Sequence, residues 1–190
     1  IIRNIALIEF ALGFSVEKKQ IYNKVPFIYS NVRELNIKST KSKKNILIIP
    51  GASHPSKRYP VESFAKLVRL LDANYHILWG NSDEELLAKE IKQSAPHVNI
   101  CPKLSIEKLA FLISQLDLVI GPDTGPTHIA WALNIPSITL YGPTPGHRNS
   151  FETKLNKIIE SDSYVNPNKI DKDDYSIRNI KVETIVIKAK

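Results

Sequence analysis

Short apolar runs alternate with longer amphipathic segments from residue 45 onward, and this alternation is the strongest constraint on the fold. In the longer segments apolar residues recur at helical spacing, as in "VESFAKLVRLLDA" (61–73). The pattern predicts strands at 45–50, 75–80, 98–101, 116–121, 137–142 and 156–161, and helices at 61–73, 82–93, 105–115, 124–134 and 182–190. Such alternation is typical of an α/β domain in which helices cover both faces of a doubly wound parallel sheet.

Two of the predicted helices begin at a serine that suits the N-cap position. Ser82 is followed three residues later by Glu85, which is the spacing of a capping box. Ser105 stands directly before the apolar positions of the 105–115 segment and is the second predicted cap.

The first 44 residues do not follow the alternating pattern. Residues 1–16 have apolar side chains at helical spacing but also carry Arg3 and Glu9, which favours an amphipathic helix over a signal peptide. Residues 18–44 lack a clear period and predict a linker with at most one short strand, "VPFIYS" (25–30). Because the sequence contains no methionine, we expect it to begin inside a longer protein.

Composition and charge exclude several classes of protein. A single cysteine, Cys101, rules out a disulfide within the chain and fits a reducing compartment. No apolar run approaches the roughly 20 residues that a membrane helix needs. The net charge of +7 comes mainly from scattered residues, with one local run, "KSTKSKKN" (38–45). We favour a solvated linker for that run, with attraction to an anionic substrate or membrane as the alternative. Neither an RNA-binding aromatic signature nor Cys/His pairs at zinc spacing are present.

Polar or Gly/Pro-rich loops follow all five strands predicted between residues 45 and 142. These loops read "GASHPSKRYP", "GNSDEE", "PKLS", "GPDTGPTH" and "GPTPGHR". Parallel strands bring their carboxyl ends to one edge of the sheet, and ligands of such folds bind outside that edge. The sequence therefore predicts a ligand site made by these five loops.

The loop "GPDTGPTH" has the composition of an anion-binding helix N-terminus. We expect Asp123 to be the N-cap, and the backbone N–H groups of Thr124 and Gly125 to face a ligand at the positive end of the helix dipole. His128 lies one turn later, where it can reach a phosphate oxygen. The alternatives are that Asp123 is a cap with no ligand and that His128 is an ordinary core or surface histidine. A metal ligand role for Asp123 lacks a second carboxylate nearby in sequence, and a hydrolytic triad lacks the Gly-x-Ser-x-Gly elbow.

The loop after the first strand supports a phosphate ligand as well. "PGASHPSKRYP" combines Gly51 with Ser53, Ser56 and Lys57, which together allow close backbone approach, hydroxyl donors and a positive charge. The spacing matches neither the P-loop nor the Gly-x-Gly-x-x-Gly dinucleotide turn. The two loops together predict a nucleoside diphosphate site of another design.

At this point the loops resemble a known family. "GASHPSKRYP", "LWGNSDEE" and "IGPDTGPTHIAWALNIPSITLYGPTPG" are similar, in order and spacing, to the C-terminal domain of the lipopolysaccharide heptosyltransferases, glycosyltransferase family 9. The similarity covers roughly residues 45–150, and "DTG" with "NIPSITLYGPT" looks closer to heptosyltransferase I than to heptosyltransferase II. One departure is Ala52, which stands where family members can have a hydroxyl residue.

The resemblance implies the two-domain GT-B architecture. Residues 1–17 would be the closing helix of an N-terminal domain, 18–44 the interdomain linker, and 45–190 the Rossmann-like C-terminal domain that binds the donor. The implied reaction is inverting transfer of L-glycero-D-manno-heptose from ADP-L-glycero-β-D-manno-heptose to the Kdo of lipid A. The implied enzyme needs no cofactor or metal, does not bind nucleic acid, and acts in the cytoplasm, peripherally on the inner membrane.

The resemblance also implies roles for individual residues. The three that it marks as catalytic are Lys57, Asp123 and His128. Lys57 and Ser53 would contact the pyrophosphate or the nearby ribose, and His128 would stabilise the departing diphosphate. The remaining implied donor contacts are Glu84 to the ribose hydroxyls, Leu104 beside the adenine, Asp123 to heptose hydroxyls, and the backbone N–H groups of Thr124 and Gly125 to the phosphates.

Several other functions stay open on sequence grounds. Heptosyltransferase II and a GT-B-type UDP-sugar epimerase need similar loops. A nucleotide-binding module without catalysis would also need only these loops. A nucleic-acid binder is suggested only by the positive net charge. No residue of the sequence is a candidate for the acceptor-side base of a transferase. We therefore expect the 190 residues alone to bind an ADP-sugar weakly and to transfer nothing.

Overall fold

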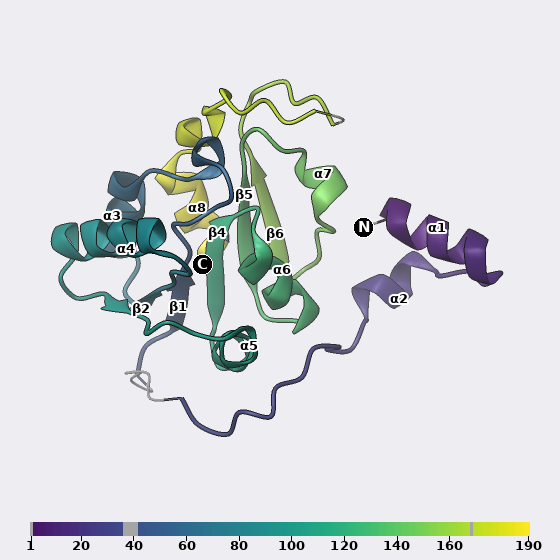
Figure 1. The fold of residues 1–190 in the computed structure, drawn as a ribbon, viewed down its shortest axis with the longest axis horizontal. Helices are drawn as coiled ribbons and strands as arrows, with labels where there is room; N and C mark the ends of the chain where they lie inside the picture. The colour runs from purple at the N-terminus through teal and green to yellow at the C-terminus, as the bar shows by residue number, and fades with distance from the viewer. Residues whose placement is uncertain (1, 36–41, 168) are drawn as a thin grey trace.

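The computed structural model describes residues 2–35, 42–167 and 169–190, which centre on one parallel sheet (Figure 1). Its strands lie in the order β3-β2-β1-β4-β5-β6, and every pair of neighbours is parallel. The strands are β1 (Asn45–Ile48), β2 (Asn74–Ile77), β3 (Asn99–Ile100), β4 (Leu118–Pro122), β5 (Ser137–Tyr141) and β6 (Asn156–Glu160). The predicted doubly wound sheet is confirmed, and the strand order reverses between β1 and β4, where such folds bind ligands.

Helices cover both faces of the sheet, as the sequence predicts. One face carries α3 (Val61–Leu70), α4 (Ser82–Ser94) and α8 (Val182–Ala189), and the other carries α5 (Ile106–Ser114) and α6 (Gly125–Ala132). Strand β1 shows how the apolar runs serve both layers, since Ile46 and Ile48 join the first core and Leu47 joins the second. A strand buried on both faces needs apolar side chains at successive positions.

Most of the observed elements are shorter than the predicted ones, although α4 ends one residue later than predicted. β1 ends at Ile48 rather than at residue 50, and α3 ends at Leu70 rather than at residue 73. Outside the N-terminal segment, three short elements were not predicted, because about one turn of helix shows no period: η1 (Pro55–Lys57), α7 (Gly146–Asn149) and η2 (Ser176–Asn179).

The N-terminal segment contains α1 (Ile2–Leu12) and α2 (Lys18–Tyr22), followed by residues without regular structure. The predicted helix is confirmed, α2 lies inside the stretch predicted as linker, and the suggested strand at 25–30 is wrong. Residues 24–35 instead run across α6 and α5, where Phe27 packs edge-on against Trp131 and Ser30 Oγ donates to the carbonyl of Glu107 at 3.1 Å. Part of the basic run at 38–45 lies outside the described residues. In the part of the chain that the structure describes, no helix combines the length and apolarity needed to cross a bilayer.

The cap of α4 differs from the prediction. Ser82 is the first residue of the helix itself, and the N-cap is Asn81, whose Oδ1 accepts the N–H of Glu84 at 3.0 Å. Asn81 has the extended backbone that lets a side chain fold back over the first turn, so the proposed Ser82–Glu85 capping box is wrong. The predicted cap of α5 is confirmed, because Ser105 Oγ accepts the N–H of Lys108 at 3.3 Å.

Asn81→Ala is expected to lower the free energy of unfolding by about 1 kcal/mol, because one N–H group of α4 loses its acceptor. Ser82→Ala is the matched control one residue away and should change stability by less than about 0.5 kcal/mol. Urea unfolding of both variants measures the difference. A larger loss for Ser82→Ala than for Asn81→Ala would contradict the observed cap.

Candidate functional site

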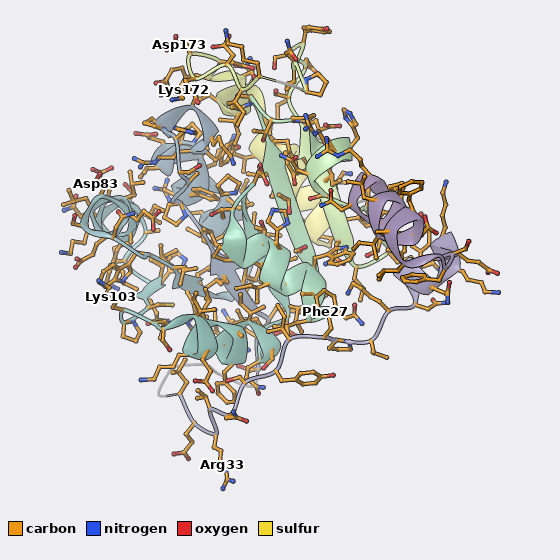
Figure 2. All side chains as sticks on the ribbon, turned by 45° about the vertical axis from the view of Figure 1, so that its right-hand side comes forward. Phe27, Arg33, Asp83, Lys103, Lys172 and Asp173 are labelled. Atoms are coloured by element: carbon orange, nitrogen blue, oxygen red, sulfur yellow. The ribbon has the colours of Figure 1, made fainter. Side chains whose placement is uncertain are left out.

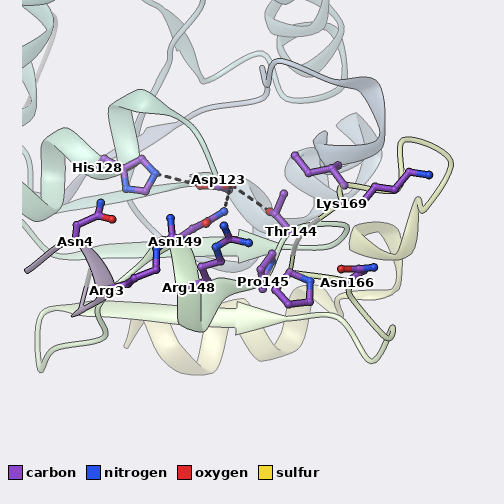
Figure 3. Close-up of a pocket in the computed structure, with 12 residues that line it drawn as sticks. Arg3, Asn4, Asp123, His128, Thr144, Pro145, Arg148, Asn149, Asn166 and Lys169 are labelled. Carbon is purple, nitrogen blue, oxygen red and sulfur yellow. Dashed lines mark hydrogen bonds and ion pairs between the residues drawn. The ribbon is translucent and has the colours of Figure 1, made fainter. Parts of the chain in front are cut away.

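Asp123 is the centre of the polar site at the carboxyl edge of the sheet. It follows β4 directly and is 8% exposed. Its Oδ2 accepts hydrogen bonds from Lys57 Nζ at 3.0 Å, Thr144 Oγ1 at 3.1 Å and Asn149 Nδ2 at 3.1 Å. Its Oδ1 lies 3.1 Å from His128 Nε2 (Figure 3). The three residues that the family resemblance marks as catalytic, Lys57, Asp123 and His128, therefore meet at one carboxylate.

Asp123 is not the N-cap of α6, which corrects the sequence prediction. The capping residue is Thr124, with φ −153° and ψ 163°, and its N–H reaches Thr127 Oγ1 at 3.4 Å. Both residues are good caps by type, and the sequence offers no way to choose between neighbours. Donors from two other loops decide the matter: Lys57 of the first loop and Thr144 and Asn149 of the segment after β5 bind the Asp123 carboxylate, and Thr124 caps the helix instead.

Lys57 reaches Asp123 from η1, at the far end of the first loop. Its side chain is 10% exposed and that of Asp123 is 9% exposed, so the ion pair is buried. Removing two charges from water is costly, and only good geometry and further hydrogen bonds offset the cost. Thr144 and Asn149 provide those further bonds to the carboxylate.

The carboxyl group of Asp123 is held in its ionised form. Burial acts to raise the pKa of this carboxyl, but the hydrogen bond with His128 and the charge of Lys57 outweigh burial and hold the pKa well below its usual range. The same negative charge, after burial, contributes to raising the pKa of the neighbouring Tyr141 hydroxyl.

The depressed pKa of Asp123 makes a prediction about acid stability. A carboxyl whose pKa is lower in the folded state stabilises the fold above its unfolded pKa, and this contribution is lost as the pH falls toward the folded pKa. From about pH 4 downward the wild type should therefore lose about 1.4 kcal/mol more per pH unit than Asp123→Asn does. Urea unfolding of both proteins at several acidic pH values measures the two slopes. Equal slopes would contradict the depressed pKa.

The largest cavity described at this edge opens beside Asp123 and His128. Its volume is about 550 Å³, and we call it the cationic cavity because Arg3, Arg148 and Lys169 also line it (Figure 3). Arg3 comes from α1 and Lys169 from the chain after β6, so segments far apart in sequence place their charges around one space. Since Lys57 already balances Asp123, these cations and His128 suit an anionic ligand.

A second cavity, of about 260 Å³, lies on the other side of the α6 N-terminus. We call it the apolar cavity, and the side chains of Trp79, Leu104 and Leu109 line it together with Glu84. The carboxylate of Glu84 sits at its polar end, where Oε2 accepts the N–H of Gly80 at 2.8 Å. Apolar walls with one fixed carboxylate suit a flat ring joined to hydroxyl groups.

The first turn of α6 separates the two cavities. Thr124 and Pro126 line the apolar cavity, whereas Asp123 and His128 line the cationic cavity. A Cβ placed on Gly125 would meet no atom within 4 Å, so the backbone at this turn is open to a ligand. The helix dipole adds positive potential at the same place. A molecule that spans both cavities would carry its anionic part over this turn.

The first loop agrees with the prediction only in part. Ser53 is exposed and, among the described residues, lines neither cavity. A Cβ on Gly51 would lie 2.3 Å from the Glu84 Cδ atom, so a larger residue there would displace the Glu84 side chain from its observed position. The loop therefore makes room for Glu84 and delivers Lys57 to Asp123.

Sequence reasoning missed several residues of the site, among them Trp79, Thr144, Arg148 and Asn149. Trp79 has a visible signal, since it is a large aromatic residue directly before a glycine at the end of a strand. The other three follow β5. Thr144 and Arg148 lie within the loop "GPTPGHR", which was identified as polar but not divided into roles, and Asn149 comes directly after it. No group of three or more metal-ligating side chains occurs within the described residues, and the absence of a metal requirement stays a prediction.

The comparisons with known proteins agree on one family. The sequence profile of glycosyltransferase family 9 (heptosyltransferase) matches residues 1–175. Lipopolysaccharide heptosyltransferase 1 of Campylobacter coli is 42% identical over 157 residues, which make up 77% of this chain and 46% of that protein. Lipooligosaccharide heptosyltransferase 2 of Haemophilus influenzae is 38% identical over 104 residues, which make up 50% of this chain and 30% of that protein.

A solved structure shows the same fold. The Escherichia coli heptosyltransferase WaaC with ADP superposes with a TM-score of 0.66 at 21% identity, covering 97% of this chain and 55% of that one. The chain spans less than half the length of the two curated relatives named above. The profile match covers most of the sequence, and the chain therefore belongs to glycosyltransferase family 9, the heptosyltransferases.

Proposed function

We propose that the protein containing this chain transfers a heptose from an ADP-heptose donor during lipopolysaccharide synthesis. The observation that carries the proposal is the pair of cavities on either side of the α6 N-terminus. One has the apolar walls and carboxylate that a nucleoside needs, and the other has cations for a charged sugar substrate. In this proposal residues 45–190 bind the donor, 18–44 are the interdomain linker, and 1–17 close an N-terminal domain.

The nucleoside of the donor would occupy the apolar cavity. Trp79 and Leu104 would contact the adenine ring, and the carboxylate of Glu84 would accept hydrogen bonds from the ribose hydroxyls. The diphosphate would then lie over Thr124 and Gly125, whose backbone is open to a ligand. Ser53 is not needed in this arrangement.

His128 is the side chain that we propose to stabilise the departing diphosphate. It lines the cationic cavity and is 43% exposed, so it can contact a ligand while Asp123 holds its ring. Four protein groups already bond to Asp123, and we therefore assign Asp123 the orientation of His128 rather than contact with heptose hydroxyls. We propose that these fixed charges remove the need for a metal ion.

For the acceptor we propose the Kdo of lipid A, as in heptosyltransferase I. The 42% identity to the heptosyltransferase 1 of Campylobacter coli supports this choice. The cations of the cationic cavity suit an acidic sugar. The acceptor is a lipid, so we place the enzyme on the cytoplasmic face of the inner membrane, where its net charge of +7 favours an anionic surface.

Calorimetric titration of the chain with ADP and with UDP tests the donor assignment. ADP is the natural choice because the heptosyltransferase that shares the fold was solved with it. Tighter binding of ADP supports the proposal. Tighter binding of UDP would favour the sugar epimerase alternative. In a parallel titration with mixed DNA, binding that ADP does not compete with would favour a nucleic-acid binder.

The transfer step needs the full-length protein. It is assayed with ADP-heptose and two acceptors, Kdo-lipid A and the same lipid already carrying one heptose. Transfer to the first acceptor alone, unchanged by a metal chelator, is the expected result. Transfer only to the second acceptor would assign heptosyltransferase II, and ADP binding without transfer to either would leave a nucleotide-binding module.

A further inference from the structure

His76 is a buried histidine that the proposed transfer reaction does not use. It lies on β2 and is 1% exposed, and neither ring nitrogen has a hydrogen-bond partner among the described residues. Its neighbours across the sheet are Leu47 of β1 and Asn99 of β3. Buried polar groups are nearly always bonded, so an imidazole with two unbonded nitrogens points to a ligand.

A cavity of about 260 Å³ lies against His76 at the amino edge of the sheet. We call it the linker pocket. Phe111, Leu112 and Leu116 line one side from α5 and the turn after it, and Leu35 lines it from the linker. Asn45, the first residue of β1, also lines it, which places this pocket at the opposite end of the strands from the cationic cavity.

Two charged residues of the linker, Arg33 and Glu34, also line the pocket. Arg33 and Glu34 are exposed, and Figure 2 shows the Arg33 side chain extending away from the body of the molecule. Burial also lowers the pKa of His76, so the imidazole is neutral at neutral pH, with one nitrogen donating and the other accepting. The amide side chains of Asn45 and Gln115 also line the pocket, so its walls combine the apolar side chains of α5 with uncharged hydrogen-bonding groups, and the ring nitrogens of His76 have no partner among the described residues.

We propose that the linker pocket binds a small aromatic molecule that carries one hydroxyl group. The volume is enough for one ring system, and the walls supply an aromatic and several aliphatic side chains. A hydroxyl group can donate to the unprotonated ring nitrogen of His76 or accept from the protonated one. Such a ligand would contact Leu35 and α5 at once, so its binding would fasten the linker to the sheet domain.

The test compares phenol with toluene, which has nearly the same shape but no hydroxyl group. Each is titrated into the chain while the ring resonances of His76 and the backbone amides of α5 are followed by NMR. Phenol is expected to bind about tenfold more tightly than toluene, the value of one buried hydrogen bond. Equal affinities of phenol and toluene would overturn the proposal. So would chemical-shift changes with phenol that do not saturate and that leave the His76 ring resonances unchanged.

His76→Leu separates the hydrogen bond from the fit of the ring. This variant keeps a similar volume, so toluene should bind as before and the preference for phenol should disappear. Replacing an unbonded polar group by an apolar one should not lower its midpoint of urea unfolding. His97→Leu, which changes an exposed histidine on the opposite face, is the matched control and should keep the preference. A preference for phenol that survives in His76→Leu would show that the imidazole is not the binding group.

Discussion

Asp123→Ala is expected to lower the free energy of unfolding by about 3–5 kcal/mol, the largest effect of any single change at the site. The alanine leaves the ammonium of Lys57 buried at 8% exposure without its counter-ion. It also removes the acceptor for the Thr144 hydroxyl and the Asn149 amide. Urea unfolding of the wild type and the variant gives the difference directly.

Two further variants show whether the unpaired charge is the cause. The double variant Lys57→Met, Asp123→Leu removes both charges and should recover a large part of the lost stability, because apolar pairs of similar volume often replace buried ion pairs. Asp72→Ala removes the carboxylate from the exposed ion pair with Lys43 and should cost less than about 1 kcal/mol. A loss in Asp123→Ala no greater than that in Asp72→Ala would contradict the buried pair.

The same prediction affects how activity data on Asp123 are interpreted. A variant that has lost several kcal/mol of stability loses activity for structural reasons alone. Activity of Asp123 variants is therefore informative only at a temperature and denaturant concentration where urea unfolding shows them to be folded. His128, which is 43% exposed in its side chain, is the better position for testing the chemistry itself.

The sequence predicts the sheet well because its signal is local. A strand buried on both faces must be apolar along its length, so "NILIIP" and "SITLYG" mark β1 and β5 without knowledge of their neighbours. The ends are less certain, because an apolar residue just past a strand looks the same in sequence as one inside it. Ile49 shows this ambiguity, being buried and apolar but outside β1.

The site could be predicted from the sequence only in part, because most of its contacts join residues that are far apart in the chain. Asp123 and His128 are only five positions apart, with Asp123 just before α6 and His128 near its start, so their pairing is a local contact. Lys57 is 66 positions from Asp123, and Asn149 is 26 positions away, so nothing in the sequence links their side chains. In the structure these donors bind the Asp123 carboxylate, and Thr124 caps α6. Because the sequence does not show the donors, Asp123 was predicted as the N-cap instead of Thr124.

Glu84→Ala is expected to weaken ADP binding by about 10- to 100-fold, because hydrogen bonds to a charged group contribute about 1.5–3 kcal/mol. Glu84 lines the apolar cavity, and the Gly80 N–H fixes its Oε2. The carboxylate therefore needs no rearrangement to accept a ribose hydroxyl. Calorimetric titration with ADP measures the loss.

Glu85→Ala is the matched control, because Glu85 stands in the same turn of α4 but pairs with Lys89 and does not line the apolar cavity. It should bind ADP as the wild type does. A second comparison replaces ADP by 2′-deoxy-ADP, which lacks one ribose hydroxyl. If Glu84 binds that hydroxyl, the deoxy analogue is weaker than ADP on the wild type and equal to it on Glu84→Ala. If Glu84→Ala still binds 2′-deoxy-ADP more weakly than ADP, the ribose lies elsewhere. If the wild type, Glu84→Ala and Glu85→Ala all bind ADP equally, the nucleoside does not occupy the apolar cavity.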